Sequence, residues 1–515
     1  MKRREFLGAI GTAGILSKQA KAEALANASA SPTPPNIIFF MTDQQRWDAL
    51  GVLNPHIKTP NLDRLAKAGI VHRQATCQVP MCIPSRNSLM FGLYPSQLGI
   101  RSNGSHSLGD SLLPFAPLPE QLLRAGYQTA GFGKMHWGRM DEVPSPRGFE
   151  VRAVGDIREG REQGARYWTI EDPQGFAAYT RETDDFGPGE EGVRGYIGCT
   201  SRVPARDQHD GWVAEQCLKF LDGGVDPRRP LFLYLSFLRP HAGYNVQKQF
   251  EDLYRIEDIP DVPQPPWQEE TGTHLAYCDR KNNFLGSRYL LWRAAWSKMT
   301  PMERRRTTLR YYAHCSWVDS YFGQALDRLQ ALGRLENALI VYTSDHGEML
   351  SERNFRFSKY CLYESSVRVP IILSGSVIPE ARRGVIDDRP AENVDLLPTI
   401  LRVAGASAPA GLQGFDLLGD ARHQASFCEF HDAGAPAYMW RTPDWKLILF
   451  MDRPLAEAGS HLDEVRGELY DLRNDPHEWN NLYSAAAQAG VREQMKTELL
   501  MHLACASAAF PVARG

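Results

Sequence analysis

The sequence predicts an α/β protein in which a large, mostly parallel central sheet is flanked by helices and followed by a small α+β domain. Continuous apolar runs of strand length alternate with helix-like segments over residues 36–374. Such runs are apolar at successive positions, which is typical of parallel strands that are covered on both faces. After about residue 408 the pattern changes to alternation, as expected of antiparallel strands.

Apolar runs predict the main strands, and capping residues delimit the helices between them. Pro60 stands at the first position of a helix that Gly69 ends, and residues 118–125 repeat this pattern before Gly126. Residues 320–332 are amphipathic and predict a further helix. The predicted strands of this part of the chain are residues 36–41, 128–132, 230–237, 338–342 and 369–373.

Two polar regions interrupt this alternation, and the C-terminal part has a pattern of its own. Residues 151–201 and 246–300 are interpreted as insertions over one edge of the sheet, which carry either substrate specificity or plain surface elaboration. The predicted C-terminal elements are a hairpin at residues 438–451, a strand at residues 468–472, a turn at residues 474–476 and a helix at residues 484–504.

The chain has 515 residues, which exceeds the usual size of one compact domain. We therefore expect a targeting segment with its linker at residues 1–35 and a large domain that carries the functional site at residues 36–408. A small antiparallel-sheet domain with a terminal helix is expected at residues 409–515.

The N-terminal residues predict export. Lys2-Arg3-Arg4-Glu5-Phe6-Leu7 resembles a twin-arginine signal, and the apolar run at residues 6–16 is too short to span a bilayer. We expect a periplasmic or secreted product that uses the twin-arginine export machinery and keeps no stable membrane anchor. The net charge of −3 gives no reason to expect nucleic acid as a partner.

Polar side chains follow four of the predicted strands at their carboxyl ends. Ligands bind at this edge of an open parallel sheet, so we expect these side chains to gather around one site. One group offers carboxylate and amide oxygens with a single imidazole, which suits a divalent cation such as Ca²⁺ better than zinc. This group consists of Asp43, Gln44, Asp345 and His346.

A second group supplies positive charge, and it consists of Arg86, Lys134, His136, His241 and Lys359. Fixed cations beside a metal ion stabilise the charge that develops when an anionic ester is cleaved. Taken singly, each residue of both groups has an ordinary interpretation, because an acid can cap a helix and a lysine is usually solvated. The occurrence of most of them after four separate strands favours a catalytic site, whereas Lys359 lies in a loop that has no such spacing signal.

The segment Cys82-Ile83-Pro84-Ser85-Arg86, followed by Ser88-Leu89-Met90 and Gly92, resembles the signature of type I sulfatases, a family of the alkaline phosphatase superfamily. A lone cysteine is more often a buried structural thiol, so the rest of the chain has to support the motif. The resemblance implies an alkaline-phosphatase-like fold. It extends over residues 35–99, 118–138, 230–241 and 311–370, with later landmarks at residues 394–399 and 468–482.

The resemblance implies that Cys82 is oxidised to formylglycine by a formylglycine-generating enzyme. The hydrated aldehyde is a gem-diol, in which one hydroxyl attacks sulfur. Sulfate then leaves as the intermediate collapses back to the aldehyde, so water need not attack the sulfated enzyme. The resemblance also makes Cys82 a metal ligand together with Asp43, Asp345 and His346, with Ca²⁺ as the expected ion.

The remaining site residues receive their roles from the same resemblance. Arg86 is expected to hold the diol, and Lys134 and Lys359 are expected to bind the sulfate group. His136 resembles the base that takes the diol proton. His241 resembles the histidine on the leaving-group side, with Lys359 as its partner.

Two positions depart from the usual pattern of the family. Most members have two acids where this chain has Asp43-Gln44, and glutamine there resembles the branch that contains choline sulfatases and phosphonate monoester hydrolases. The neutral amide lowers the charge around the metal, which makes Mn²⁺ or Mg²⁺ an alternative to Ca²⁺. Phe91 stands where threonine is usual. Lys134 and His136 are both present, as in true sulfatases, which counts against phosphonate as the main substrate.

The sequence therefore predicts an exported sulfatase that cleaves the S–O bond of a sulfate monoester on a carbohydrate or a small alcohol. One alternative is a phosphate or phosphonate monoester hydrolase that uses the same site. An alternative of another class is a protein that binds sulfated ligands without turnover and keeps Cys82 unmodified.

Overall fold

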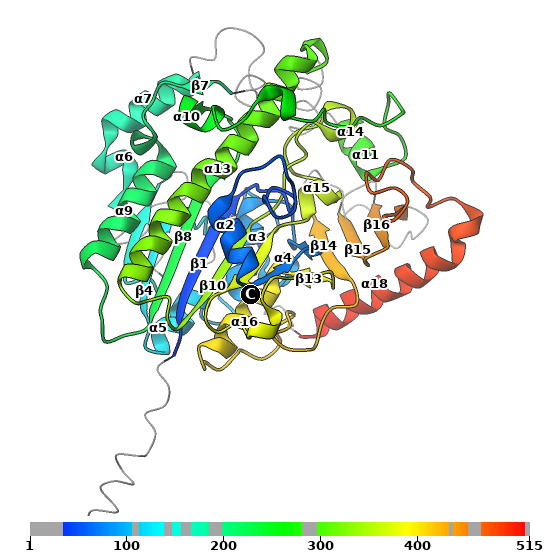
Figure 1. The fold of residues 1–515 in the computed structure, drawn as a ribbon. Helices are drawn as coiled ribbons and strands as arrows, with labels where there is room; N and C mark the ends of the chain where they lie inside the picture. Colours follow the sequence, from blue (N-terminus) through cyan, green and yellow to red (C-terminus); the bar gives the residue numbers. More distant parts are fainter. Residues whose placement is uncertain are drawn as a thin grey trace, which may run out of the picture.

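The computed structural model describes residues 34–105, 113–137, 147–155, 166–184, 198–280, 296–431, 436–451 and 465–509. The predicted targeting signal lies outside these residues. Figure 1 shows a twisted central sheet with helices on both faces and a smaller sheet beside it, which carries the last helix along one side. Among the described residues, no helix combines the length and the apolar character that a membrane span requires.

The central sheet has nine strands and is mostly parallel, as predicted. Strand β1 lies in its middle, and Ile37 pairs with Leu339 on one side and with Phe232 on the other. Of the described strands in this sheet, β11 alone runs opposite to its neighbours. In spatial order the strands are β12 (Val385–Asp387), β2 (Ile70–His72), β11 (Ile371–Ser374), β10 (Ala338–Ser344), β1 (Asn36–Asp43), β8 (Leu231–Pro240), β4 (Gln128–Gly133), β5 (Val151–Val154) and β6 (Arg166–Tyr167).

Helices cover both faces of this sheet (Figure 1). On one face, α2 (Pro60–Lys67), α9 (His209–Gly223) and α13 (Pro301–Ala331) share an apolar core with the strands, in which the rings of Phe40 and Phe322 stack 4.7 Å apart. On the other face, α3 (Cys82–Phe91), α5 (Leu118–Arg124) and α16 (Leu396–Val403) pack against the sheet. Both faces of the strands are buried, which explains their continuous apolar runs.

Helix α13 begins much earlier than predicted. Thr300 caps it, and the side chain of Glu303 accepts a hydrogen bond from the Thr300 backbone N–H to complete a capping box. The prediction started at residue 320 because the first half of the helix buries polar side chains, including Arg310 and His314, which hide the amphipathic period.

The prediction that residues 151–201 form only an insertion is wrong in part. Strands β5 and β6 fall in this region and extend the central sheet by two parallel strands. They have only four and two residues, so the sequence gives them no recognisable apolar run. The remaining strands and α-helices outside the C-terminal sheet are β3 (Ala75–Thr76), β7 (Thr200–Ser201), β9 (Val246–Gln247), β13 (Ala391–Glu392), α4 (Pro95–Leu98), α6 (Trp168–Glu171), α7 (Pro173–Asp184), α10 (Lys248–Glu251), α11 (His274–Arg280), α14 (Glu352–Phe355) and α15 (Glu364–Val367).

The C-terminal part forms a four-stranded antiparallel sheet, as its alternating pattern indicated. Its strands are β14 (Ser426–Phe430), β15 (Ala437–Arg441), β16 (Trp445–Met451) and β17 (Val465–Asp471). Helix α18 (Ala489–Ala509) covers one face, as Figure 1 shows, while the other face shares a core with α3 and α16. The helix starts five residues later than predicted because turns occupy the residues before it.

Candidate active site

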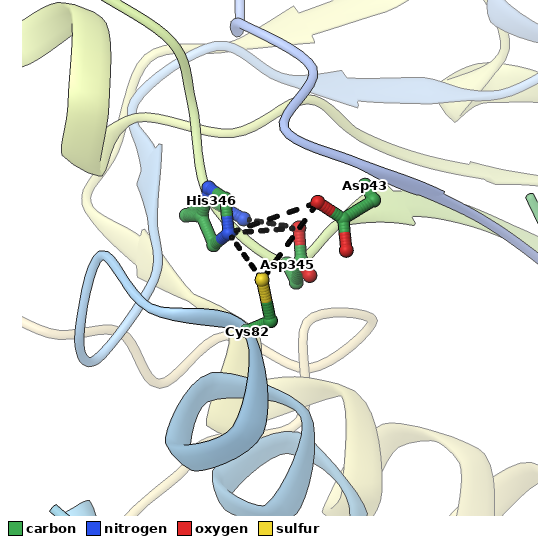
Figure 2. Close-up of side chains that lie close together, drawn as sticks. All are labelled: Asp43, Cys82, Asp345 and His346. Carbon is green, nitrogen blue, oxygen red and sulfur yellow. Dashed lines mark hydrogen bonds and ion pairs between the residues drawn. The ribbon is translucent and has the colours of Figure 1, made fainter. Parts of the chain in front are cut away.

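The metal-ligand candidates meet at the carboxyl ends of two neighbouring parallel strands. Asp43 is the last residue of β1, and Asp345 and His346 follow β10 directly. Cys82 lies at the first position of α3 and points its sulfur toward them (Figure 2). One ligand atom from each of these four buried residues lies within 4.8 Å of the others. The sheet topology therefore produces the clustering that the sequence predicted.

The donor atoms in this cluster fit a divalent cation. His346 Nε2 lies 3.3 Å from Cys82 Sγ and 3.6 Å from Asp345 Oδ1, while Cys82 Sγ lies 3.9 Å from Asp43 Oδ1. Nδ1 of His346 lies 3.0 Å from the Gly347 carbonyl oxygen, a contact that needs a proton on Nδ1. Burial opposes the charged form of His346, but the carboxylate of Asp345 raises its pKa. Loss of the Nε2 proton leaves a lone pair that faces the two carboxylates, which is the ligand form of histidine.

Gln44 joins this cluster through a strained backbone. Its φ angle is 67°, a left-handed conformation that is uncommon outside glycine. The Gln44 N–H donates to Asp345 Oδ1 at 3.0 Å, and the side-chain oxygen Oε1 accepts from Lys359 Nζ at 2.8 Å. Strain of this kind persists where surrounding contacts over-determine it, as at functional sites.

Three buried cations balance the carboxylates. Arg86, in the second turn of α3, donates from Nε to Asp345 at 2.8 Å and from Nη2 to Asp43 at 3.2 Å. Lys134 Nζ lies 2.7 Å from Asp43, and Lys359 Nζ lies 3.0 Å from Cys82 Sγ. Burial opposes ionisation of Asp43, but Lys134 and Lys359 outweigh it and hold its pKa well below the usual range.

The Cys82 thiol differs from the structural cysteines of the chain. Burial and the carboxylate of Asp43 oppose its ionisation, but Lys134 and Lys359 lower its pKa to about 7. By contrast, burial raises the pKa of Cys361 to about 11 and that of Cys217 above its usual value. A thiol with a lowered pKa at a helix N-terminus is reactive, which distinguishes Cys82 from an inert core residue.

His136 and His241 lie beside this cluster after strands β4 and β8. Both are partly exposed, unlike the four buried metal-ligand candidates. Desolvation and the charge of Lys134 hold the pKa of His136 well below its usual value. Desolvation and Lys359 do the same for His241. Both imidazoles are therefore neutral at neutral pH, the form that accepts a proton.

The structure adds residues to the site that the sequence did not assign. Ser236 and Tyr234, on β8, accept hydrogen bonds from Arg86 Nη1 at 2.9 and 3.3 Å. Asn103 accepts the Ile83 N–H near the start of α3 at 3.1 Å. Glu348 accepts a hydrogen bond from the Gln44 side chain. Of these residues, only Glu348 could have been suggested by the sequence, because it lies two positions after His346 in the same short segment.

Such an arrangement belongs to an enzyme that cleaves an anionic ester. Its carboxylates and imidazole suit a divalent cation, and three buried cations beside them can stabilise negative charge that develops on a bound ester.

The chain belongs to the sulfatase family, because the family model described as "Sulfatase" matches residues 35–406. The model described as "N-sulphoglucosamine sulphohydrolase, C-terminal" matches residues 352–504. The chain is accordingly a sulfuric ester hydrolase, and its α/β fold with a mostly parallel sheet is the fold of this superfamily. The predicted family, fold class and enzyme class are confirmed.

A curated relative and two solved structures are similar to this chain over most of its length. An arylsulfatase of Clostridium perfringens is 29% identical over 475 residues, which cover 88% of this chain and 90% of the relative. The phosphonate monoester hydrolase of Agrobacterium radiobacter has a TM-score of 0.70 at 21% identity, covering 92% of this chain and 96% of that one. BT4656, solved in complex with its substrate D-glucosamine-2-N,6-O-disulfate, has a TM-score of 0.65 at 22% identity, covering 94% and 100%.

Proposed function

We propose that this chain is an exported sulfatase that cleaves the S–O bond of a sulfate monoester on a carbohydrate or a small alcohol. The observation that carries this proposal is the position of Cys82, whose sulfur lies 3.0 Å from Lys359 Nζ and 3.3 Å from His346 Nε2. A sulfur atom between a cation and a set of candidate metal ligands occupies the position expected of a nucleophile. In this proposal Cys82 is converted to formylglycine by a formylglycine-generating enzyme.

The proposed metal ligands are Asp43, Gln44, Cys82, Asp345 and His346, with Ca²⁺ as the first choice of ion and Mn²⁺ or Mg²⁺ as alternatives. A divalent ion bound there supplies a Lewis acid for a sulfate oxygen, and formylglycine supplies the attacking hydroxyl. Both carboxylates already accept hydrogen bonds from Arg86, which fixes their orientation. The ligand set is therefore pre-organised by the protein itself.

The other side chains of the site handle charge and protons. Lys134 and Lys359 would bind the sulfate oxygens, and Arg86 would orient the nucleophile from within α3. His136 would accept the diol proton as sulfate leaves, and His241 would face the leaving group. Because both histidines are held neutral, each has a lone pair available before the reaction begins.

The substrate class is supported by the relatives rather than by the site alone. BT4656, which shares the fold, is described with a sulfated glucosamine as its substrate. A sulfated carbohydrate is accordingly the first substrate to test on this chain. The proposed periplasmic or secreted location and the division at residue 408 stand on the sequence pattern described above.

A second candidate function is hydrolysis of phosphate or phosphonate monoesters by the same site. Gln44 favours the phosphate ester, because a neutral ligand leaves more positive charge for a doubly charged phosphate monoester. A phosphonate monoester carries one negative charge, as a sulfate monoester does. Matched aryl sulfate and aryl phosphonate monoesters separate the two functions, since the leaving group is identical. We expect kcat/KM on the sulfate to exceed that on the phosphonate by at least about tenfold. A higher value on the phosphonate would reverse the order of the two candidates.

Activity should persist into mildly acidic solution. His136 must be neutral to accept a proton, and its pKa lies well below its ordinary value of 6.5, so the rate should fall only below that pH. The measurement is kcat/KM on an aryl sulfate across the acidic range. A His136→Asn variant should be slower and should lose this acidic limb. A limb centred above pH 6.5 in the parent would contradict the role of His136.

A further inference from the structure

Glu348 is buried behind the metal-ligand set, and neither the sequence resemblance nor the proposed mechanism gives it a role. It lies two residues after His346, and none of its surface is exposed. Its carboxylate accepts hydrogen bonds from the side-chain amide of Gln44 and from the backbone N–H groups of Leu350, at 3.1 Å, and of Ser358. All three partners are donors, which is what an ionised carboxylate satisfies best.

These contacts decide which end of the Gln44 amide faces the ligands. Gln44 Nε2 donates to Glu348 Oε2, and Gln44 Oε1 accepts from Lys359 Nζ at 2.8 Å. The reverse orientation would place the amide N–H groups against an ammonium and the amide oxygen against a carboxylate. Two charged neighbours therefore fix the oxygen on the side of Cys82 and Asp43, which lie 3.0 and 3.9 Å from Lys359 Nζ.

We propose that Glu348 is a positioning residue that orients and polarises Gln44 as a metal ligand. An amide that donates its N–H to a carboxylate has a more negative oxygen, because adjacent hydrogen bonds polarise one another. The Gln44 side chain is neutral. Glu348 places a carboxylate directly behind it, joined to the amide by one hydrogen bond. This inference rests on the proposed function only in requiring a divalent ion at the site.

The same carboxylate also fixes the other partner of the Gln44 oxygen. Leu350 and Ser358 stand at the two ends of the loop that precedes Lys359, and both donate to Glu348 Oε1. Both residues have left-handed φ angles, of 45° and 73°. A buried acceptor that holds both ends of the loop keeps Lys359 beside Gln44. Glu348 thus positions both the Gln44 amide, by a direct hydrogen bond, and the Lys359 ammonium, through the loop that precedes it.

The test measures metal affinity directly, without turnover. The purified full chain and its variants are dialysed against chelator, and then Ca²⁺ and Mn²⁺ binding is measured by equilibrium dialysis. Glu348→Gln should raise Kd by about 10- to 100-fold, the usual effect of losing a partner that orients a ligand. The new amide group cannot accept from Gln44 and from both backbone N–H groups at once.

A swapped pair of residues makes the test specific. In the double variant Gln44→Glu with Glu348→Gln, a carboxylate faces the metal and its second oxygen accepts from the new amide at position 348. The amide oxygen there still accepts from Leu350 and Ser358. Kd should return to within about threefold of the parent value. The single variant Gln44→Glu completes the double-mutant cycle, and a coupling between the two substitutions is expected beyond the gain that the added charge alone gives. This variant also keeps the hydrogen-bond pattern, so it should fold even if Glu348→Gln does not.

Asp395→Asn is the matched control. Asp395 is also fully buried and accepts three hydrogen bonds, from the N–H groups of Glu392 and Phe415 and from His423, but it lies against no proposed metal ligand. Its Kd for metal should stay within about twofold of the parent. The inference is overturned if Glu348→Gln matches this control, if the swapped pair binds no better than Glu348→Gln, or if the parent binds neither ion. A parent that binds metal but hydrolyses no sulfate ester would instead overturn the proposed function alone.

Discussion

Replacing Cys82 with alanine should lower hydrolysis of an aryl sulfate by at least about a thousandfold, because no neighbouring side chain can replace a covalent nucleophile. The measurement is the initial rate at saturating substrate for parent and variant, each checked for folding by thermal denaturation. The parent peptide that carries Cys82, isolated from an aerobic host, should have the mass of formylglycine rather than that of the thiol.

The control for this prediction is Cys217→Ala. Cys217 lies on the buried face of α9, and burial raises the pKa of its thiol, which marks it as inert. Its removal should lower stability slightly and leave the rate almost unchanged. If Cys82→Ala retains the rate of the parent, Cys82 is not the nucleophile, and the alternative of a protein that only binds sulfated ligands gains support.

Replacing Arg86 with methionine should destabilise the fold by about 3–5 kcal/mol, because it leaves buried carboxylates without their shared cation. Arg86 is 1% exposed and bonds both Asp43 and Asp345, whose side chains are fully buried. Lys134 still faces Asp43, but Asp345 has no comparable lysine contact among the described residues. The shift is measured from denaturant unfolding in the presence of chelator, so that a bound ion cannot replace the lost charge. Turnover should fall as well.

Arg73→Met serves as the comparison for this variant. Arg73 pairs with Asp388 at 2.7 Å, but its side chain is 41% exposed, so water takes over when the pair is lost. The expected cost is at most about 1 kcal/mol. Equal effects of the two substitutions would mean that the buried pairs around Arg86 are no more important for stability than an ordinary surface ion pair.

The position of the site could be predicted from the sequence because parallel strands align their carboxyl ends. Asp43 and Asp345 are separated by about 300 positions, yet the pairing of β1 with β10 brings them together. The order of apolar strands and the residues after them contain this information. The long first half of α13 did not follow from the sequence, because its buried polar side chains bond to distant segments that no local pattern reveals.

The detailed contacts of the site lie beyond sequence reasoning for the same reason. Ser236 and Tyr234 contact Arg86 from within a mostly apolar strand, in which neither residue stands out as part of a site. The orientation of the Gln44 amide depends on Glu348 and Lys359, which approach it from opposite sides. Residue types and spacing predict which groups gather, whereas the direction of each hydrogen bond depends on packing between segments far apart in the chain.

The burial of Cys82 has a consequence for how the proposed active protein is made. Its side chain is only 2% exposed, at the start of a helix that packs on all sides. A modifying enzyme must therefore reach the thiol while this stretch is still unfolded. A molecule that folds first keeps its thiol for its lifetime. The active fraction of a preparation then depends on the rate of thiol modification relative to the rate of folding. Faster synthesis without more modifying enzyme should yield more protein of lower specific activity.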